Sequence, residues 1–202
     1  MTLHQATAVV AAGFWHRTAA WVLDASALGV IATVFTWPSI HAGWMTVRAA
    51  AALLSERASE AMVDGLLDGT QLPALVQSLL HDPLMLAPAR SLQSGLWSMA
   101  VPWLLGYTLL ALAWHVVGER SPWQASPGKH VLGLQVTDLQ GRRLSWPRAL
   151  LRNVASVLSW LTLNLGHAMA LVPPQKRALH DYIAGARVVR GQASSARLRT
   201  RR

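Results

Sequence analysis

The chain of 202 residues is 52% hydrophobic and 13% charged, whereas soluble globular domains carry about 25% charged residues, so the composition favours one integral membrane bundle. The sequence contains no cysteine, which excludes disulfides, thiol catalysis and cysteine-ligated metals. We interpret the net charge of +9 as arginines that flank membrane spans on the cytoplasmic side and meet the lipid bilayer, so nucleic acid is not an expected partner.

The first predicted membrane helix covers residues 18–37 and, with the N-terminus, makes up a segment of residues 1–38. Its length suits the about 20 apolar residues that a helix needs to cross the hydrocarbon layer. Arg17 stands at its start and Asp24 lies inside it. The small residues 25–27 have the form of a signal-peptide cleavage site, but the two charges are foreign to the apolar core of a signal, so we expect no cleavage.

Residues 39–95 differ from the span before them, because they hold five of the nine acidic residues and only three arginines. Their alanine-rich stretches with helical periodicity predict an amphipathic helical insertion on the extracytoplasmic side. A second transmembrane helix is predicted at residues 96–118, where three tryptophans are spread along an apolar run that tolerates Pro102.

The cytoplasmic segment of residues 119–146 changes from a helical to an alternating period. Leu132, Leu134 and Val136 alternate with glycine and polar residues, and a turn signal follows at residues 138–141. This pattern predicts a small β-hairpin or an extended loop.

The topology of the third apolar run, residues 148–172, is inferred from the lysines and arginines on either side of it. Six lysines and arginines lie in residues 119–152 and eight lie from residue 173 onwards, so both segments are expected in the cytoplasm. We therefore expect the run to enter the membrane as a broken or re-entrant helix, with the break near Asn164 and His167. A plain third span is the alternative.

The predicted fold class is an all-α membrane protein with two transmembrane helices, a third apolar broken or re-entrant segment, and a small cytoplasmic β-hairpin or extended loop. The third segment belongs to residues 147–190, and residues 191–202 form a basic tail. Both termini are then expected on the cytoplasmic side of the membrane.

Three blocks of the sequence resemble the RDD family of bacterial membrane proteins, which is named for one arginine and two aspartates. Arg17 and Asp24 match the first pair, residues 126–153 read SPGKHVLGLQVTDLQGRRLSWPRALLRN, and residues 176–189 read KRALHDYIAGARVV with Asp181 as the second aspartate. The resemblance implies a multi-pass protein of the bacterial cytoplasmic (inner) membrane. It also implies a role in the transport of undefined ligands, and some members have been linked to sodium/proton antiport.

Asp24 is the strongest candidate for a functional residue, because inserting an ionised group at the centre of a span costs a free energy of at least about 2.5–3.5 kcal/mol. Arg17 lies about 10 Å away along a helix axis, which is too far for a direct bond. We therefore expect Asp24 to hold a proton, or to meet His115, Asn164, His167 or a bound cation. Two roles for Asp24 are left open. It is either a carboxylate that couples to an ion or proton, or a polar clasp that locks helix packing.

The remaining charged candidates lie on the cytoplasmic side. Arg17 either reaches lipid phosphate or forms an ion pair with Asp181. Lys129, Arg142 and Arg143 are expected to contact lipid headgroups.

No other site chemistry is predicted. The eight histidines contain no i,i+4 pair, and the phosphate-loop spacing is absent, so we expect no metal, no cofactor and no enzymatic activity. The expected function is a transport-related subunit in which a mid-membrane carboxylate couples to a proton or cation. Two spans are too few to enclose a pathway, so the expected partner is a second copy in a homo-oligomer or another membrane protein. The alternative is a non-catalytic membrane scaffold or assembly protein whose arginine and aspartate residues hold helices together.

Overall fold

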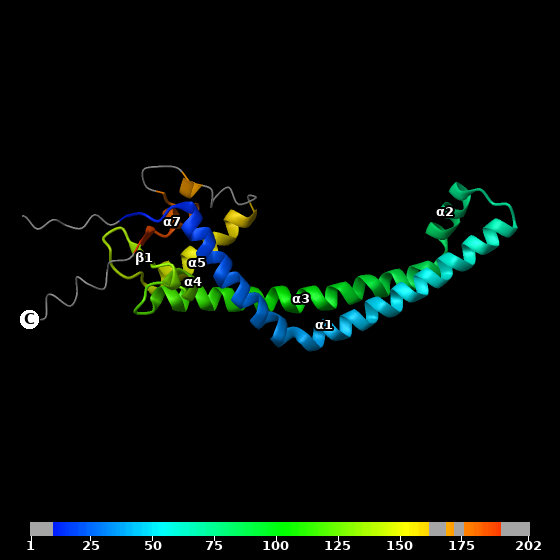
Figure 1. Cartoon of the computed structure of the whole chain (residues 1–202), viewed down its shortest axis with the longest axis horizontal. Helices are drawn as coiled ribbons and strands as arrows, with labels where there is room; N and C mark the ends of the chain where they lie inside the picture. The colour runs from blue at the N-terminus through cyan, green and yellow to red at the C-terminus, as the bar shows by residue number, and fades with distance from the viewer. Residues whose placement is uncertain (1–9, 162–168, 172–175, 191–202) are drawn as a thin grey trace, which may run out of the picture. The chain divides into compact units, whose positions relative to one another are not determined.

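The computed structural model describes residues 10–161, 169–171 and 176–190. The elements in chain order are α1 (Phe14–Leu67), α2 (Leu72–His81), α3 (Pro83–Arg120), α4 (Pro127–Val131), β1 (Leu134–Asp138), α5 (Trp146–Leu161), η1 (Met169–Leu171), α7 (Leu179–Ile183) and β2 (Ala186–Arg190) (Figure 1). The chain divides into two compact units, which we call unit 1 (residues 1–29 and 108–202) and unit 2 (residues 30–107). The protein is therefore mostly helical, with one small sheet.

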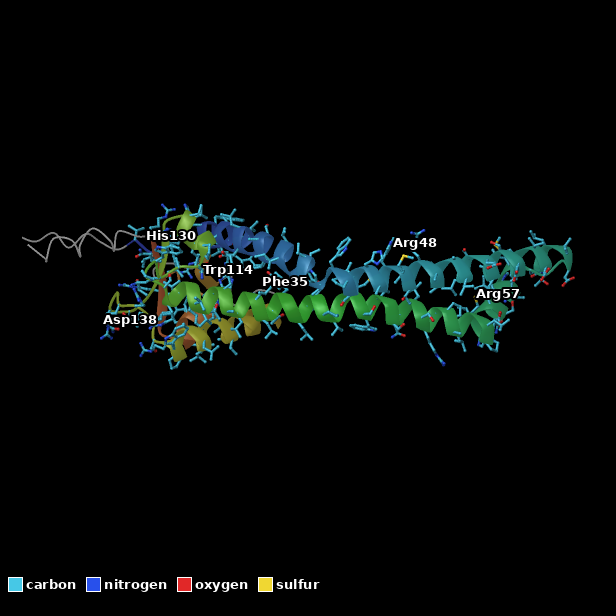
Figure 2. The ribbon with its side chains drawn as sticks, turned by 90° about the horizontal axis from the view of Figure 1, so that it is seen from below. Phe35, Arg48, Arg57, Trp114, His130 and Asp138 are labelled. Atoms are coloured by element: carbon cyan, nitrogen blue, oxygen red, sulfur yellow. The ribbon has the colours of Figure 1, made fainter. Side chains whose placement is uncertain are left out.

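The two longest helices, α1 and α3, are long and apolar enough to cross a membrane, and each reaches a mean hydropathy of 1.6 over its most apolar window. Large apolar side chains are exposed along both helices. Phe35, labelled in Figure 2, is 76% exposed, and Leu109 is 66% exposed. Exposed apolar side chains in such numbers are suited to contact with lipid rather than with water.

Helix α1 continues through Pro38 to Leu67, beyond the end near residue 38 that the sequence predicts. Proline lacks the backbone N–H of one helical hydrogen bond, but membrane helices tolerate this loss. The alanine-rich residues that follow favour helix and carry the element onward.

Unit 2 is a helical hairpin, in which the second part of α1 packs against the first part of α3. The backbones approach closely at two glycines, since a Cβ atom on Gly43 would lie 2.7 Å from the carbonyl oxygen of Gly95. Further along, the Trp103 indole N–H donates to Thr33 Oγ1 at 2.9 Å. The predicted insertion is thus helical, and it is made of the end of α1, all of α2 and the start of α3.

Unit 1 contains an antiparallel pair of strands, β1 and β2, with Leu134 opposite Arg190 and Asp138 opposite Ala186. The prediction of a local hairpin is therefore wrong about the strand that pairs with β1. This strand lies some fifty residues later and is not the next segment of the chain. Asp138 turns the chain by accepting the backbone N–H groups of Gln140 and Arg142, at 2.9 and 2.7 Å. The chain then leads into α5 instead of returning as a strand.

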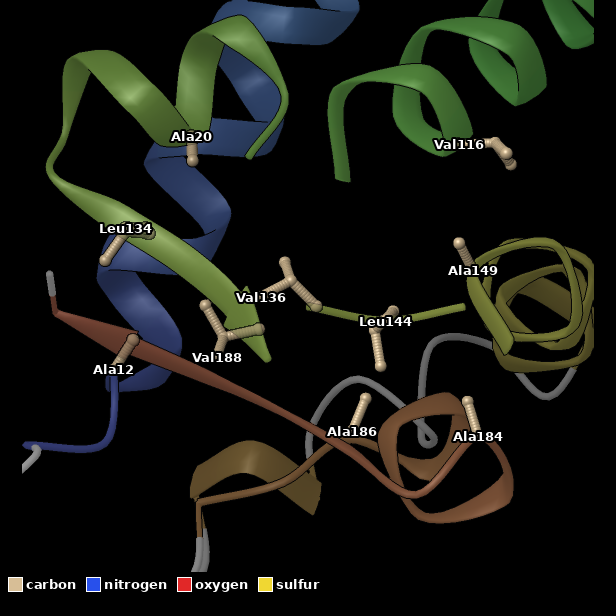
Figure 3. Packing of buried hydrophobic residues seen from close by; sticks show 10 residues of the cluster. All are labelled: Ala12, Ala20, Val116, Leu134, Val136, Leu144, Ala149, Ala184, Ala186 and Val188. Atoms are coloured by element: carbon tan, nitrogen blue, oxygen red, sulfur yellow. The ribbon is translucent and has the colours of Figure 1, made fainter. Parts of the chain in front are cut away.

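The apolar core of unit 1 lies around this sheet and joins it to the start of α1, the end of α3, α5 and α7 (Figure 3). Its members are small or medium side chains, namely Ala12, Ala20, Val116, Leu134, Val136, Leu144, Ala149, Ala184, Ala186 and Val188. The segment before α1 is attached as well, because the Ala12 N–H donates to the Val188 carbonyl oxygen at 2.9 Å. Close packing of small residues lets the polar side chains of neighbouring elements meet.

The third apolar run is helical over α5, which packs against α7. The predicted break at Asn164 and His167 lies outside the described residues. Whether the run spans or re-enters stays a prediction.

Candidate functional site

Asp24 of α1 is 1% exposed and is held by three hydrogen-bond donors within unit 1. Its Oδ1 atom accepts the indole N–H of Trp114 at 2.9 Å and the backbone N–H of Gly128 at 2.8 Å. Its Oδ2 atom accepts the hydroxyl hydrogen of Ser126 at 2.6 Å. All three donors are neutral, so hydrogen bonds rather than a salt bridge offset the loss of water around this carboxyl group.

The short helix α4 explains why the sequence has Ser-Pro-Gly-Lys at this point. Its N-cap residue, Ser126, makes no capping bond with its own side chain, because that hydroxyl is directed to Asp24. The Asp24 carboxylate instead accepts an N–H of the first turn of α4 and so caps the helix from another element. A Cβ atom on Gly128 would lie 2.4 Å from the Ala20 carbonyl oxygen and 2.9 Å from Asp24 Cγ. Only glycine fits there.

A second polar group, the ion chain, runs through unit 1 with alternating charge. Its five residues are Lys129, Glu119, Arg152, Asp181 and Arg17. The Lys129 ammonium lies 2.7 Å from Glu119 Oε1, and the Arg152 guanidinium also binds that oxygen. Arg152 Nε donates to Asp181 Oδ1 at 2.8 Å, and Arg17 binds Asp181 Oδ2. The ion chain therefore joins α4, α3, α5, α7 and α1.

Additional bonds fix the ends of the ion chain. Arg17 donates to the backbone carbonyl oxygens of Ala12 at 3.1 Å and Lys176 at 2.7 Å. Asp181 Oδ2 also accepts the backbone N–H of Ala178 at 3.2 Å, which caps the first turn of α7. Every charged group in the ion chain thus has a partner of opposite charge, and both terminal segments of unit 1 are attached to it.

The electrostatics of the ion chain act differently on its carboxylates and its cations. Burial alone would raise the pKa of Asp181, but the guanidinium groups of Arg152 and Arg17 hold that pKa well below its usual range. Burial lowers the pKa of Lys129, and the neighbouring Glu119 and Asp24 carboxylates work in the opposite direction. The ion chain contains three cations and two carboxylates, so its formal net charge is +1.

His115 lies one helical turn before Glu119 on α3, so the two side chains share a helix face. Its Nδ1 atom is buried and has no hydrogen-bond partner among the residues that the structure describes. A buried ring nitrogen of this kind is available to a water molecule.

Comparison with known proteins identifies the family of the chain. The model of the RDD family matches residues 11–185, which include every residue of the two polar groups. The chain belongs to the RDD family. It is 32% identical over 89 residues to the protein titled "Uncharacterized protein YxaI" of Bacillus subtilis (strain 168); the match covers 44% of this chain and 58% of that relative. No solved structure matches the chain.

The three residues that give the RDD family its name have different surroundings here. Arg17 and Asp181 form an ion pair, which is one of the two alternatives that the sequence offers for Arg17. Asp24 has no cation within ion-pair distance among the described residues, and its partners are Trp114 and Ser126 together with one backbone N–H. The arginine and the two aspartates are thus split between the ion chain and the Asp24 site.

Of the three residues predicted to contact lipid headgroups, Lys129 is placed otherwise, whereas the contacts of Arg142 and Arg143 stay predictions. The Lys129 side chain is 13% exposed and pairs with Glu119, so it is turned away from the surface where headgroups were expected. The reason is that a buried carboxylate needs a cation more strongly than a headgroup does. Arg142 is 73% exposed while its Nε donates to Asp138, and Arg143 is half-buried.

Sequence reasoning missed Glu119, Arg152 and Trp114 as members of the site. Glu119 and Arg152 look like ordinary charges beside an apolar run, and the tryptophan looks like an interfacial anchor. Two signals were available: an acidic residue directly after an apolar helix, and the arginine that closes the block of residues 126–153. Of the neighbours predicted for Asp24, Asn164 and His167 lie outside the part of the chain that the structure describes.

Proposed function

We propose that this RDD protein is a subunit of a transport system in which Asp24 takes up and releases a proton or exchanges it for a cation. The observation that carries the proposal is the bond between Asp24 Oδ2 and the Ser126 hydroxyl. A hydroxyl donates to a carboxylate and accepts from a carboxylic acid. Asp24 therefore keeps a hydrogen-bond partner in both protonation states.

The other buried carboxylates lack this property. Glu119 and Asp181 face guanidinium or ammonium groups, which only donate, so protonation of either would leave a buried cation without its partner. Asp24 is the group suited to a reversible change of charge.

Two long apolar helices do not enclose a pathway by themselves. The proposal therefore includes a second copy of the chain or another membrane protein as partner. It places the protein in the bacterial cytoplasmic membrane with both termini in the cytoplasm, and it assigns the chain no catalytic activity.

Asp24→Asn tests the proposal in proteoliposomes. The asparagine oxygen can accept from Trp114 and Gly128, and its amide can donate to Ser126, so the variant imitates the protonated form and should fold normally. Cation-dependent proton flux should fall at least tenfold, measured with a trapped pH-sensitive dye. Ser126→Thr, which keeps the hydroxyl, is the matched control. Undiminished flux in Asp24→Asn, or no flux in the wild type, would contradict the proposal.

The alternative function is a membrane scaffold or assembly protein, and a different observation favours it. Asp24 is fully hydrogen-bonded, and Gly128 packs so closely that its Cβ position overlaps Asp24. Full hydrogen bonding and close packing are what a polar clasp between helices requires. In that case Asp24→Asn should leave every property of the protein unchanged, whereas Asp24→Leu should prevent folding because three buried donors lose their acceptor.

A further inference from the structure

Helix α5 of unit 1 has a buried face of small and polar residues and an exposed face that carries large apolar residues. In α5, Ala149, Arg152 and Ala155 are buried, while Leu150 and Val154 are 46% and 51% exposed. A helix on the surface of a soluble protein has the opposite arrangement. The outer face of α5, which also carries Trp146 and Leu151, is thus built to meet an apolar medium.

Helix α7 repeats this arrangement. His180 and Asp181 are buried, whereas Tyr182 and Ile183 are 45% and 43% exposed. Because the same inversion occurs in two helices that pack together, it is a property of the surface of unit 1 rather than of one element.

The outward charge of unit 1 is entirely basic. Its four acidic residues, Asp24, Glu119, Asp138 and Asp181, are each at most 4% exposed. The other five acidic residues of the sequence lie in unit 2, and none of them is buried. The exposed or half-buried arginines of unit 1 near α5 are Arg142, Arg143 and Arg148.

Aromatic rings and guanidinium groups are paired at this surface. The Arg120 guanidinium lies 5.1 Å from the centre of the Trp146 ring, and the Arg177 guanidinium lies 4.1 Å from the centre of the Tyr182 ring. Both rings are about half exposed. Aromatic side chains with one polar end and cations beside them are typical of the boundary between lipid headgroups and acyl chains.

We propose that the outer faces of α5 and α7 lie in a leaflet of anionic phospholipid, with Leu150 and Val154 among the acyl chains and Arg143 and Arg148 at the phosphates. Charge complementarity selects this occupant. A second copy docking through the same face would bring two sets of arginines together without an exposed carboxylate of unit 1 to offset them. Anionic lipid supplies both the apolar medium and the negative charge.

The absence of cysteine from the sequence allows a direct test, since single cysteines can be introduced into the full chain and spin-labelled. The test variants are Leu150→Cys and Val154→Cys, and the control is Gln140→Cys at the exposed turn after β1. In nanodiscs of phosphatidylglycerol and phosphatidylcholine, dissolved oxygen should relax the labels at 150 and 154 several-fold more than a water-soluble nickel chelate does. The label at 140 should show the reverse. Chelate access at 150 and 154 equal to that at 140 would overturn the proposal, and so would spin–spin broadening, which would indicate a second copy.

A second measurement addresses the headgroups. Phosphatidylglycerol added to the protein in neutral detergent should raise its thermal midpoint by several degrees more than phosphatidylcholine does. The double variant Arg143→Gln/Arg148→Gln should lose this difference, while the matched pair Arg48→Gln/Arg90→Gln in unit 2 should keep it. Equal effects of the two lipids on the wild type would contradict the choice of anionic lipid.

Discussion

Ser126 donates its hydroxyl hydrogen to Asp24 Oδ2 across 2.6 Å, although the two residues are 102 positions apart in the sequence. This hydrogen bond attaches the loop after the second long helix to a buried residue of the first long helix. This relationship also gives the Ser-Pro-Gly-Lys block a physical meaning: one residue bonds the carboxylate by its side chain, another by its backbone, and the lysine belongs to the ion chain.

Gly128→Ala should strongly destabilise the protein. The added methyl group would overlap the Ala20 carbonyl oxygen, which belongs to helix backbone and cannot turn aside, so we expect a loss of about 1–3 kcal/mol or more. The measurement is thermal unfolding in detergent, followed by circular dichroism. Gly29→Ala is the control, because nothing lies within 4 Å of its Cβ position, and it should be neutral or slightly stabilising. Similar unfolding temperatures for the two variants would show that α4 does not pack as described.

Removing Arg17 and removing Asp181 should not be additive. Arg17→Ala leaves a buried carboxylate with Arg152 as its remaining guanidinium partner. Asp181→Ala takes the carboxylate partner from Arg17 and leaves Arg152 with Glu119 alone, so each should cost about 3–5 kcal/mol. The double variant should cost clearly less than the sum, by on the order of 1–3 kcal/mol. A double-mutant cycle by denaturant unfolding provides the comparison. Strict additivity would mean that the ion pair contributes nothing.

Glu119 should be the least replaceable member of the ion chain, since it holds Lys129 and Arg152 at once. Glu119→Gln places two buried cations against a neutral amide, and we expect the folding yield to fall severalfold. Lys129→Met in the same chain should restore part of the yield, because Lys129 is the cation left unpaired, whereas Arg152 keeps Asp181. The yield of monodisperse protein after detergent extraction is the measurement. If Lys129→Met deepens the defect instead, the lysine has another partner.

Acidification should destabilise unit 1 through Asp181. The pKa of Asp181 is lower in the folded protein than in the unfolded chain, so its stabilising contribution is complete above the unfolded value of about 3.9 and is lost as the pH falls from there toward the folded value. Thermal midpoints between about pH 2 and pH 7 should therefore decline most steeply below about pH 4. Asp181→Asn should be less stable at neutral pH and should show a flatter acid limb. Glu60→Gln, on the exposed part of α1, is the control; an unchanged slope in Asp181→Asn would refute this assignment.

The sequence predicts the two long apolar helices, because length and hydropathy are properties of the linear chain, and it offers Asp181 as one of two alternative partners for Arg17. It does not predict the partner of β1, since two five-residue strands some fifty positions apart carry no local signal for each other. The ion chain was only half predicted for a related reason. An arginine such as Arg152 is counted as a cytoplasmic charge when its neighbours in sequence are considered, and its burial becomes visible only once α5 is placed against Glu119 and Asp181.

The ion pair between Arg17 and Asp181 also forms late in biosynthesis. Its two residues are separated by 164 positions, so at about 5–20 residues per second the arginine waits on the order of 10–30 s for its aspartate to leave the ribosome. Arg152 emerges in between, and it can meet Glu119 but lacks its second carboxylate until Asp181 follows. The newly inserted chain therefore passes through a period with unmatched charges beside its apolar helices, and whatever shields those charges during that period decides how much of the protein matures.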